Sequence, residues 1–445
     1  LWKLGVPAKT EHNEAAPAQH ELAPIFTTTN IAADHNQLTM ELMQKIARKH
    51  GMVCLLHEKP FEGVNGSGKH NNWSLATNTG VNLFEPGDTP YENAQFLLLL
   101  CAVIQAVDDY QDLLRLSVAS ASNDRRLGRL EAPPAIISLY LGRELEEILS
   151  AIERGESYGS REKELFKVGV HALPKFPKDS TDRNRTSPMA FTGNKFEFRM
   201  VGSSASISGA NVALNTAVAE SLRQYADRLE GAENFEDALH GLIRDVVCRH
   251  RRIIFSGNGY DGGWCAEAKR RGLLNLPATP DCVPCYLAEK NIDLFTRHGV
   301  YTPAELRARY QIKLDNYCKV IHIEAQTLCG MIWQDVLPAL SAYSERLARS
   351  ALEKGKLALP AEFESDCCAD ISRGMTKIRD AVVRLQADNE RAAAMGDALE
   401  AARFSRDVLL AEMDELRVLT DRMEAVTARE FWPYPSYGDI LFGIQ

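Results

Sequence analysis

The chain has 445 residues, of which 45% are hydrophobic and 25% charged, proportions that are typical of a globular protein and exclude a disordered one. Its formal net charge of −9, with no pronounced basic run, disfavours nucleic-acid binding through a broad positive face. The longest apolar run, residues 96–104, is far too short to cross a membrane. The ten cysteines are scattered, which fits free thiols in a reducing cytoplasm better than a disulfide framework.

The first part of the chain predicts strands, loops and one helix. Residues 1–30 are rich in Thr, Pro and Ala and predict extended structure. Apolar residues at helical spacing predict a helix over 32–50. Short apolar segments predict strands at 52–56 and 73–77, on either side of a Gly- and Asn-rich loop over 61–72.

The middle of the chain predicts one long helix, a loop and a strand before a helical region. Residues 93–118 predict a single amphipathic helix. Residues 175–194 are basic, contain Pro and lack periodicity, and loops of that length are usually functional. Alternating apolar and charged residues predict a strand over 195–201, and helical patterns dominate from about residue 210. The expected fold class is therefore α+β.

The tail predicts a helical hairpin at about residues 370–428. Two stretches carry apolar residues at helical spacing with charged residues between them, and they are joined through 395–397. These apolar positions are Ile378, Val382 and Leu385 in the first stretch and Leu409, Met413, Leu416 and Met423 in the second. A packing role fits this pattern better than a cofactor site.

A Gly-rich segment, Asn65-Gly66-Ser67-Gly68-Lys69-His70, is the strongest candidate motif. It nearly matches a phosphate-binding loop, but His70 stands where Ser or Thr should hold magnesium, and a strand rather than a helix is expected next. We therefore reject that interpretation. Small residues before a histidine let backbone amides approach a ligand that the imidazole also faces. The alternative is an ordinary turn with a surface histidine.

Two carboxylates, Glu14 and Glu21, are separated by Pro17, which makes a shared regular helix unlikely. A strand-turn-strand could instead bring both to one point, where they would offer oxygen ligands to magnesium or manganese. The alternative is a solvated polar hairpin. Glu197 and Arg199 fall on one face of the predicted strand and could bind a metal and an anionic substrate side by side, unless they form only a surface ion pair.

Several arginines could recognise carboxylates or phosphates. Arg126 precedes a Gly-containing segment that includes Glu131 and ends in Pro133-Pro134. Arg183 and Arg185 lie in the predicted long loop, and each of these arginines could equally be a flexible surface side chain. Cys282 and Cys285 have zinc-ligand spacing but no second pair, so we interpret them as structural thiols.

Taken in order, these segments resemble glutamine synthetase. The resemblance rests on Glu14 to Glu21, on the Asn65–His70 motif, on Arg126-Leu-Gly-Arg-Leu-Glu131-Ala-Pro and on Glu197-Phe-Arg199. Each motif is weak alone, but four in the order of the family are specific. The type III subgroup is indicated by His57-Glu-Lys-Pro-Phe61, by Glu131-Ala-Pro-Pro-Ala-Ile-Ile137, by Phe198-Arg-Met-Val-Gly-Ser-Ser204 and by Trp432-Pro-Tyr-Pro-Ser-Tyr-Gly-Asp439. The resemblance covers essentially the whole chain.

The resemblance implies a curved, mainly antiparallel sheet with helices in a catalytic domain over 1–209, followed by a helical region over 210–445. It assigns the divalent metals, Mg²⁺ or Mn²⁺, to Glu14, Glu21, His70 and Glu197. It assigns glutamate to Asn65, Gly66, His70, Arg126 and Arg199. It assigns the ATP phosphates to Ser74 and Arg185, and it makes Glu131 the flap acid that helps to bind ammonium. Arg126, Glu131 and Arg185 are the catalytic candidates.

The implied activity is ATP-dependent ligation of ammonia to glutamate through a γ-glutamyl phosphate, in a cytoplasmic homo-oligomer that forms a ring-shaped dodecamer. No nucleic acid or membrane partner is expected. The chain departs from the family pattern at Ala190, where a second nucleotide arginine belongs, and at Asn72, where a second histidine belongs. It also starts at Leu1 without an initiator Met, so we expect a missing amino-terminal part with further metal ligands and an inactive fragment. The alternatives are a glutamate–amine ligase of the same fold and a non-catalytic structural or regulatory relative.

Overall fold

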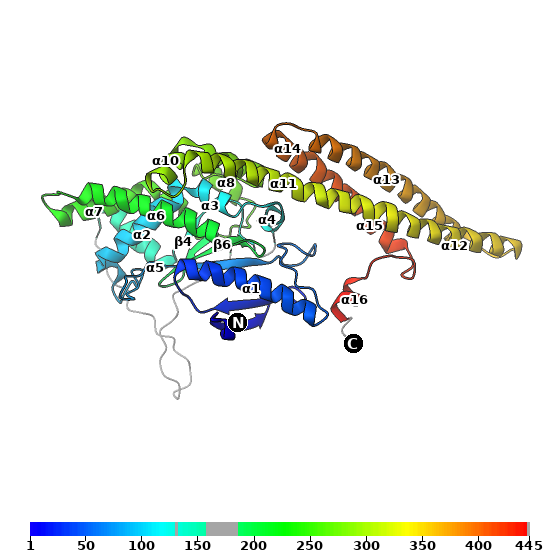
Figure 1. Cartoon of the computed structure of the whole chain (residues 1–445), viewed down its shortest axis with the longest axis horizontal. Coiled ribbons are helices and arrows are strands. Elements are labelled where there is room, and N and C mark those ends of the chain that lie inside the picture. The colour runs from blue at the N-terminus through cyan, green and yellow to red at the C-terminus, as the bar shows by residue number, and fades with distance from the viewer. Residues whose placement is uncertain (130–131, 157–185, 443–445) are drawn as a thin grey trace, which may run out of the picture. The chain divides into compact units, whose positions relative to one another are not determined.

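The computed structural model describes residues 1–129, 132–156 and 186–442, which form two compact units over 1–308 and 309–445 (Figure 1). Both strands and helices occur in the first unit, and only helices occur among the described residues of the second. The α+β class and the helical carboxy-terminal region are therefore as the sequence predicts. The expected boundary between a catalytic domain and a helical region after residue 209 stays a prediction. The first compact unit itself continues to Ala308. No helix in the described part of the chain is long and apolar enough to span a membrane.

Two sheets carry the strands. Strands β1 (Ala8–Asn13) and β2 (His20–Pro24) form an antiparallel pair by themselves. A second sheet has the order β3-β6-β5-β4, from β3 (Gly68–Trp73), β6 (Phe196–Gly202), β5 (Met189–Phe191) and β4 (Leu139–Tyr140). All strand pairs are antiparallel except β4 with β5. The sheet is mainly antiparallel as expected, but it is small and separate from the β1–β2 hairpin.

Three expected elements differ from the structure. Residues 52–56 form no strand, and β3 instead begins at Gly68, inside the segment that Gly and Asn content marks as a loop. Pairing with β6 overrides the weak strand propensity there. Similarly, β5 lies inside the expected long loop over 175–194, of which residues 175–185 lie outside the described part.

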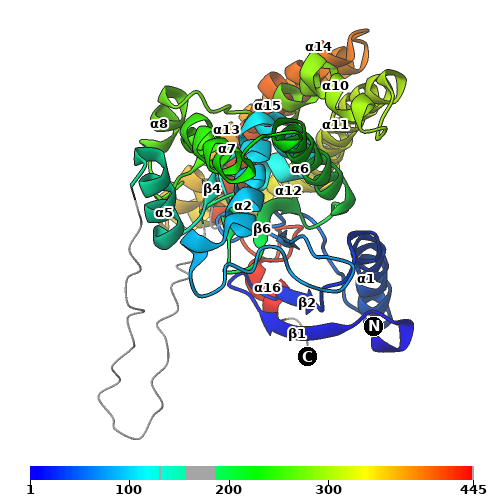
Figure 2. The ribbon, with the colours of Figure 1, turned by 90° about the vertical axis from the view of Figure 1, so that its left-hand side faces the viewer.

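The expected helix over 93–118 is two helices, α2 (Ala94–Asp109) and α3 (Gln111–Ser117). The break falls at Tyr110, where the side-chain amide of Gln111 donates to the carbonyl of Asp108 at 3.0 Å. Asn93 caps the start of α2 by accepting a hydrogen bond from the backbone of Phe96 at 3.0 Å. The expected helix over 32–50 is α1 (Thr29–Lys49), which lies next to the β1–β2 hairpin in Figures 1 and 2.

The core of the first unit lies around α2, most of whose residues are buried. Helix α2 packs against α6 (Ser208–Leu229) and α7 (Phe235–His250), which lie beside it in Figure 2. A cluster of aromatic side chains belongs to the core at the start of β6. The rings of Phe84 and Phe196 meet edge to face there, with their centroids 5.1 Å apart. The other helices of this unit are α4 (Ala121–Arg126), α5 (Arg143–Arg154), α8 (Trp264–Arg270), α9 (Thr279–Cys282) and α10 (Glu289–Arg297), with 3-10 turns η1 (Trp2–Leu4), η2 (Pro90–Glu92), η3 (Arg251–Ile253) and η4 (Val283–Leu287).

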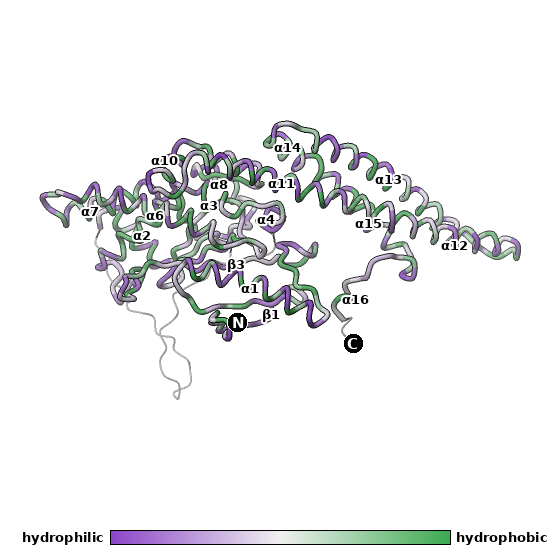
Figure 3. The backbone as a smooth tube through the Cα atoms, in the orientation of Figure 1, coloured by the Kyte–Doolittle hydropathy of each residue, from purple (hydrophilic) through white to green (hydrophobic). Residues whose placement is uncertain are grey.

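The second unit contains the expected hairpin and a further helix packed on it. Helix α13 (Glu362–Ala393) is followed by a turn at residues 394–397. The chain then returns along α13 through α14 (Ala398–Phe404), the π-helical segment η6 (Ser405–Leu409) and α15 (Leu410–Val426). Gly374 lets the two helices approach closely, since a Cβ there would lie 2.9 Å from Cε of Met423. Helix α12 (Leu337–Lys356) also packs along α13, and Figure 3 shows hydrophobic and hydrophilic positions alternating along these helices.

The remaining elements of the carboxy-terminal region are α11 (Pro303–Met331), the π-turn η5 (Ile332–Val336) that continues it into α12, and the short α16 (Tyr437–Phe442). The apolar positions that predicted the hairpin are buried in its seam: Ile378, Val382 and Leu385 on one side and Leu409, Met413, Leu416 and Met423 on the other. The tail therefore has a packing role, as its periodicity indicates.

Candidate functional site

The β1–β2 hairpin brings Glu14 and Glu21 together with a histidine. His12 pairs with Glu21 across the two strands, and Glu14 lies directly after the end of β1, two residues beyond His12. Nδ1 of His12 lies 3.2 Å from a carboxylate oxygen of Glu14, and Nε2 lies 3.6 Å from one of Glu21. The ligand atoms of all three residues fall within 4.8 Å of one another. One cation could therefore contact all three.

The two carboxyl groups of this hairpin lie close enough to perturb each other. Burial raises the pKa of Glu21, the hydrogen bond with Glu14 raises it further, and the neighbouring imidazole of His70 lowers it. Two carboxylates that lie this close together repel each other when both are ionised, and a proton or a cation between them relieves the repulsion. The donor set of carboxylates and imidazole fits a divalent metal such as Mg²⁺ or Mn²⁺.

Strands β3 and β6 carry the second group, His70, Glu197 and Arg199. Nδ1 of His70 lies 2.9 Å from one carboxylate oxygen of Glu197, and Nη2 of Arg199 donates to the other at 2.7 Å. Burial would raise the pKa of Glu197, but the hydrogen bond from His70 and the charge and hydrogen bond of Arg199 lower it to about 2. Glu197 is therefore ionised at physiological pH. A carboxylate in this state could bind a metal without first losing a proton.

The two groups adjoin, because His70 lies close enough to lower the pKa of Glu21. The side chain of Gln19 adds a direct link, since its Nε2 donates to the carbonyl of Gly66 at 3.0 Å and thereby ties the β1–β2 hairpin to the Gly-rich loop. The structure thus brings together Glu14, Glu21, His70, Glu197 and Arg199. They come from two separate sheets, whereas the resemblance implies a single curved sheet.

Arg126 lies under the Gly-rich loop and is only 5% exposed. A Cβ at Gly68 would collide with its guanidinium, and a Cβ at Gly66 would lie 3.1 Å from its Cγ. The guanidinium donates to the carbonyl of Arg199 at 3.1 Å and to Oδ1 of Asn123 at 3.2 Å. Burial lowers the pKa of Arg126 to about 10. The small residues of the motif therefore serve close packing on this arginine, which the sequence alone did not indicate.

The other predicted site residues are less informative. Asn65 is half-buried in the Gly-rich loop, and Ser74 is exposed just after β3. Ala190 is buried on β5 directly opposite Glu197, so this position offers no polar group. Glu131, Arg183 and Arg185 lie outside the described residues. The described residues that follow Glu131 and Arg185 both contact a loop over 255–263. The amide of Gly259 in this loop donates to Oγ1 of Thr186 at 2.7 Å, and a Cβ at Gly259 would lie 3.3 Å from Pro134.

Sequence reasoning missed His12, Gln19 and this loop. The alternation of His12 with Glu14 was a usable signal, because strand residues two apart share a face. Gln19 and the 255–263 loop had no such signal, since their contacts lie far away in the sequence. Tyr260, in that loop, lies near enough to Arg126 to influence the pKa of its guanidinium.

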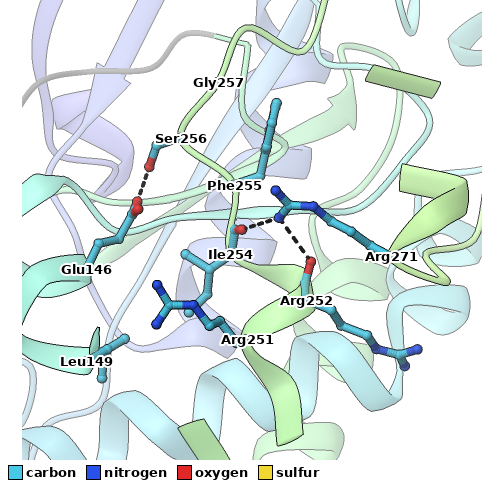
Figure 4. A pocket seen from close by; sticks show the side chains of 9 residues that line it. All are labelled: Glu146, Leu149, Arg251, Arg252, Ile254, Phe255, Ser256, Gly257 and Arg271. Atoms are coloured by element: carbon cyan, nitrogen blue, oxygen red, sulfur yellow. Dashed lines mark hydrogen bonds between the residues drawn. The ribbon is translucent and has the colours of Figure 1, made fainter. Parts of the chain in front are cut away.

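A pocket of about 490 Å³ lies elsewhere in the first unit, between α5 and the start of the 255–263 loop (Figure 4). Arg251, Arg252 and Arg271 line it, and each is paired with an acid: Glu153, Asp108 and Glu267 respectively. Asp108 also bonds to His250 at 2.8 Å and is 2% exposed. These pairings compensate the charges internally, so we interpret the cluster as structural.

An antiparallel pair of strands thus brings carboxylates together beside a glycine loop that covers a buried arginine, and these are donor groups that a divalent metal and an anionic substrate could use. The family model described as "Glutamine synthetase, catalytic domain" matches residues 1–134, and the one described as "Glutamine synthetase C-terminal domain" matches residues 238–355. The chain belongs to the glutamine synthetase family.

Three curated relatives match essentially the whole chain. A glutamine synthetase of Butyrivibrio fibrisolvens is 48% identical over 100% of this chain and 64% of its own length. A type-3 glutamine synthetase of Dictyostelium discoideum is 43% identical over 99% and 61%, and a glutamine synthetase of Bacteroides fragilis is 38% identical over 99% and 62%. The chain thus spans somewhat less than two thirds of these relatives. A solved structure titled "Apo GmaS without ligand" has a TM-score of 0.36 and 18% identity over 61% of this chain and 56% of that one, a likeness too low to carry an argument.

Proposed function

We propose that this chain takes part in the ATP-dependent ligation of ammonia to L-glutamate, with γ-glutamyl phosphate as the intermediate. The observation that carries the proposal is the joined pair of groups, Glu14 and Glu21 on one sheet and His70, Glu197 and Arg199 on the other. The relatives named glutamine synthetase support the same activity.

In this proposal the carboxylates and His70 hold Mg²⁺ or Mn²⁺, which neutralises the phosphates of ATP and the phosphoryl group in transfer. Glu197 is suited to this because its neighbours keep it ionised at any physiological pH. His12 is a further candidate ligand beside Glu14 and Glu21.

The glutamate substrate is assigned to the Gly-rich loop with Asn65 and Gly66, to His70 and to Arg199. The resemblance assigns Arg126 to glutamate as well, but because this side chain is buried under the loop, we propose that it supports the subsite from below. Ser74 and Arg185 are assigned to the nucleotide phosphates. With no polar group at Ala190, other residues must supply any further nucleotide contact.

The test uses the full-length protein and measures glutamine formed from glutamate, ammonia and ATP. Glu197→Ala should lower the rate at least about 100-fold, since it removes a proposed metal ligand and the carboxylate that accepts from Arg199. Glu41→Ala, an exposed glutamate paired with Lys45 on α1, is the matched control and should retain activity. A wild-type protein that hydrolyses no ATP and forms no glutamine would refute the proposal.

The identity of the amine rests on Glu131, the proposed ammonium-binding acid. Glu131→Gln keeps the shape of the side chain but removes its charge, so capture of ammonia should suffer more than formation of the acyl phosphate. The expected signature is glutamate-dependent ATP hydrolysis without glutamine release. If the variant instead turns over with a larger amine as well as the wild type does, a glutamate–amine ligase is the better assignment.

We further propose a cytoplasmic homo-oligomer, with a ring-shaped dodecamer as the specific expectation. The free thiols support a reducing compartment, because the described cysteines form no disulfide. Light scattering of the full-length protein tests the assembly. A monomer that forms glutamine at a normal rate would contradict the expectation that catalysis needs neighbouring subunits.

A further inference from the structure

Glu58 is a fully buried carboxylate next to the Gly-rich loop, with 0% of its surface exposed. Its Oε1 accepts hydrogen bonds from the backbone N–H of Ser204 at 2.9 Å and from the hydroxyl of the same residue at 2.6 Å. Its Oε2 has no hydrogen-bond partner among the described residues. Gly202 makes room for the side chain, since a Cβ there would lie 2.9 Å from Cγ and Cδ of Glu58. A glutamate in such a place needs a reason beyond packing, because burying an ion is costly.

The backbone of Glu58 holds the Gly-rich loop directly. Its carbonyl accepts a hydrogen bond from the N–H of Ser67 at 2.8 Å. A Cβ at Gly66 would lie only 2.7 Å from this carbonyl oxygen. The side chain and the backbone of one residue thus connect the loop to the turn that follows β6.

Two cations lie near Glu58. A Cβ at Gly66 would contact both the carbonyl oxygen of Glu58 and Cγ of Arg126, and Nζ of Lys69 donates to the carbonyl of Ser203, beside Ser204, at 2.8 Å. The guanidinium of Arg126 donates to neutral oxygens of Asn123 and of the β6 backbone, and Glu58 opposes the lowering of its pKa by burial. Removing the nearby negative charge would leave the buried guanidinium less well compensated, which is unfavourable.

We propose that Glu58 is a positioning residue for the glutamate subsite, because it joins the Gly66–Ser67 loop to the Ser204 turn and lies near Arg126 beneath that loop. The inference rests on the proposed function and deepens it. Glu58 itself does not touch the substrate. It acts through Gly66 and Arg126, so its loss should affect glutamate more than ATP.

The experiment compares Glu58→Gln with wild type in the full-length protein. The amide keeps the volume and can still accept from Ser204, but it removes the charge. We expect the KM for glutamate, and the Kd for glutamate from calorimetry, to rise about 10- to 100-fold, the effect of one uncompensated buried charge. The KM for ATP and kcat should change less than about 3-fold. The control is Glu62→Gln in the same segment, whose side chain is 68% exposed and which should behave as wild type.

The outcomes separate the two proposals. If the wild type forms glutamine and Glu58→Gln has unchanged glutamate KM and Kd, or raises the KM values of glutamate and ATP equally, the positioning role is wrong and the proposed function stands. If the wild type neither binds nor consumes glutamate, both fail. If Glu58→Gln does not fold, Ser204→Ala decides: it keeps the carboxylate but removes one bond to Oε1. A selective rise in glutamate KM of about 3-fold or more supports the role, and an unchanged KM overturns it.

Discussion

Gly68→Ala probes the close packing between the Gly-rich loop and Arg126. The new Cβ would lie 2.8 Å from Nε and closer still to the rest of the guanidinium. Because the backbone at Gly68 is not in the left-handed region, the substitution causes no backbone strain, and the collision is the main perturbation. The guanidinium must retreat by about 1 Å to restore an ordinary contact.

The retreat has a calculable cost. It weakens the two well-formed hydrogen bonds of Arg126, to the Arg199 carbonyl at 3.1 Å and to Asn123 at 3.2 Å. At about 1 kcal/mol for each bond, and with a further 1–2 kcal/mol for leaving a buried charged group less well paired, the variant should lose about 3–4 kcal/mol. The glutamate KM should rise as well, since Arg126, which supports the proposed glutamate subsite, is displaced.

Urea-induced unfolding, followed by fluorescence and circular dichroism, measures this loss. Gly262→Ala is the matched control, because its Cβ would have no neighbour within 4 Å and its backbone also avoids the left-handed region. The reasoning is refuted if Gly68→Ala and Gly262→Ala unfold within about 0.5 kcal/mol of each other and share the wild-type glutamate KM.

Three further predictions concern Glu197, the metal ligands and the thiols. The pKa of Glu197 is about 2 in the folded chain against an ordinary 4.5, so the stability that its charge contributes is present above about pH 4.5 and is lost as the pH falls toward 2. Glu197→Gln should remove this pH-dependent part of the free energy of unfolding, at most about 3 kcal/mol. An identical pH dependence of unfolding in both proteins would contradict the prediction. Calorimetry with Mn²⁺ should show at least about 10-fold weaker binding in Glu21→Gln than in the wild type, in which binding should release protons. The control is Glu11→Gln, which should bind Mn²⁺ as the wild type does, because Glu11 precedes His12 by one residue and therefore lies on the other face of β1. Burial raises the pKa of Cys282 to about 12 and that of Cys285 to about 11, so the double Ser variant should keep its activity and its metal content, and joint loss of zinc and activity would identify a thiolate site instead.

The sequence by itself determined the family, the α+β class and the helical carboxy-terminal region, and it supplied the candidate residues of the proposed metal site. Each of these depends on local pattern: the order of short motifs, the spacing of apolar residues along α13 and α15, and the alternation along β6. Such signals survive without knowledge of the fold, because the period of a helix or strand is a property of the backbone.

Only the tertiary structure decided which residues meet. Strand β3 exists because β6 lies beside a Gly- and Asn-rich segment with little strand propensity of its own. His12 joins Glu14 and Glu21 because of the hairpin register, and Gln19 reaches Gly66 across 47 residues of chain. The burial of Glu58 and Arg126 could not be inferred either, since charged residues are usually exposed and nothing local marks the exception. Long-range pairing and burial are set by the whole fold, which a local pattern does not contain.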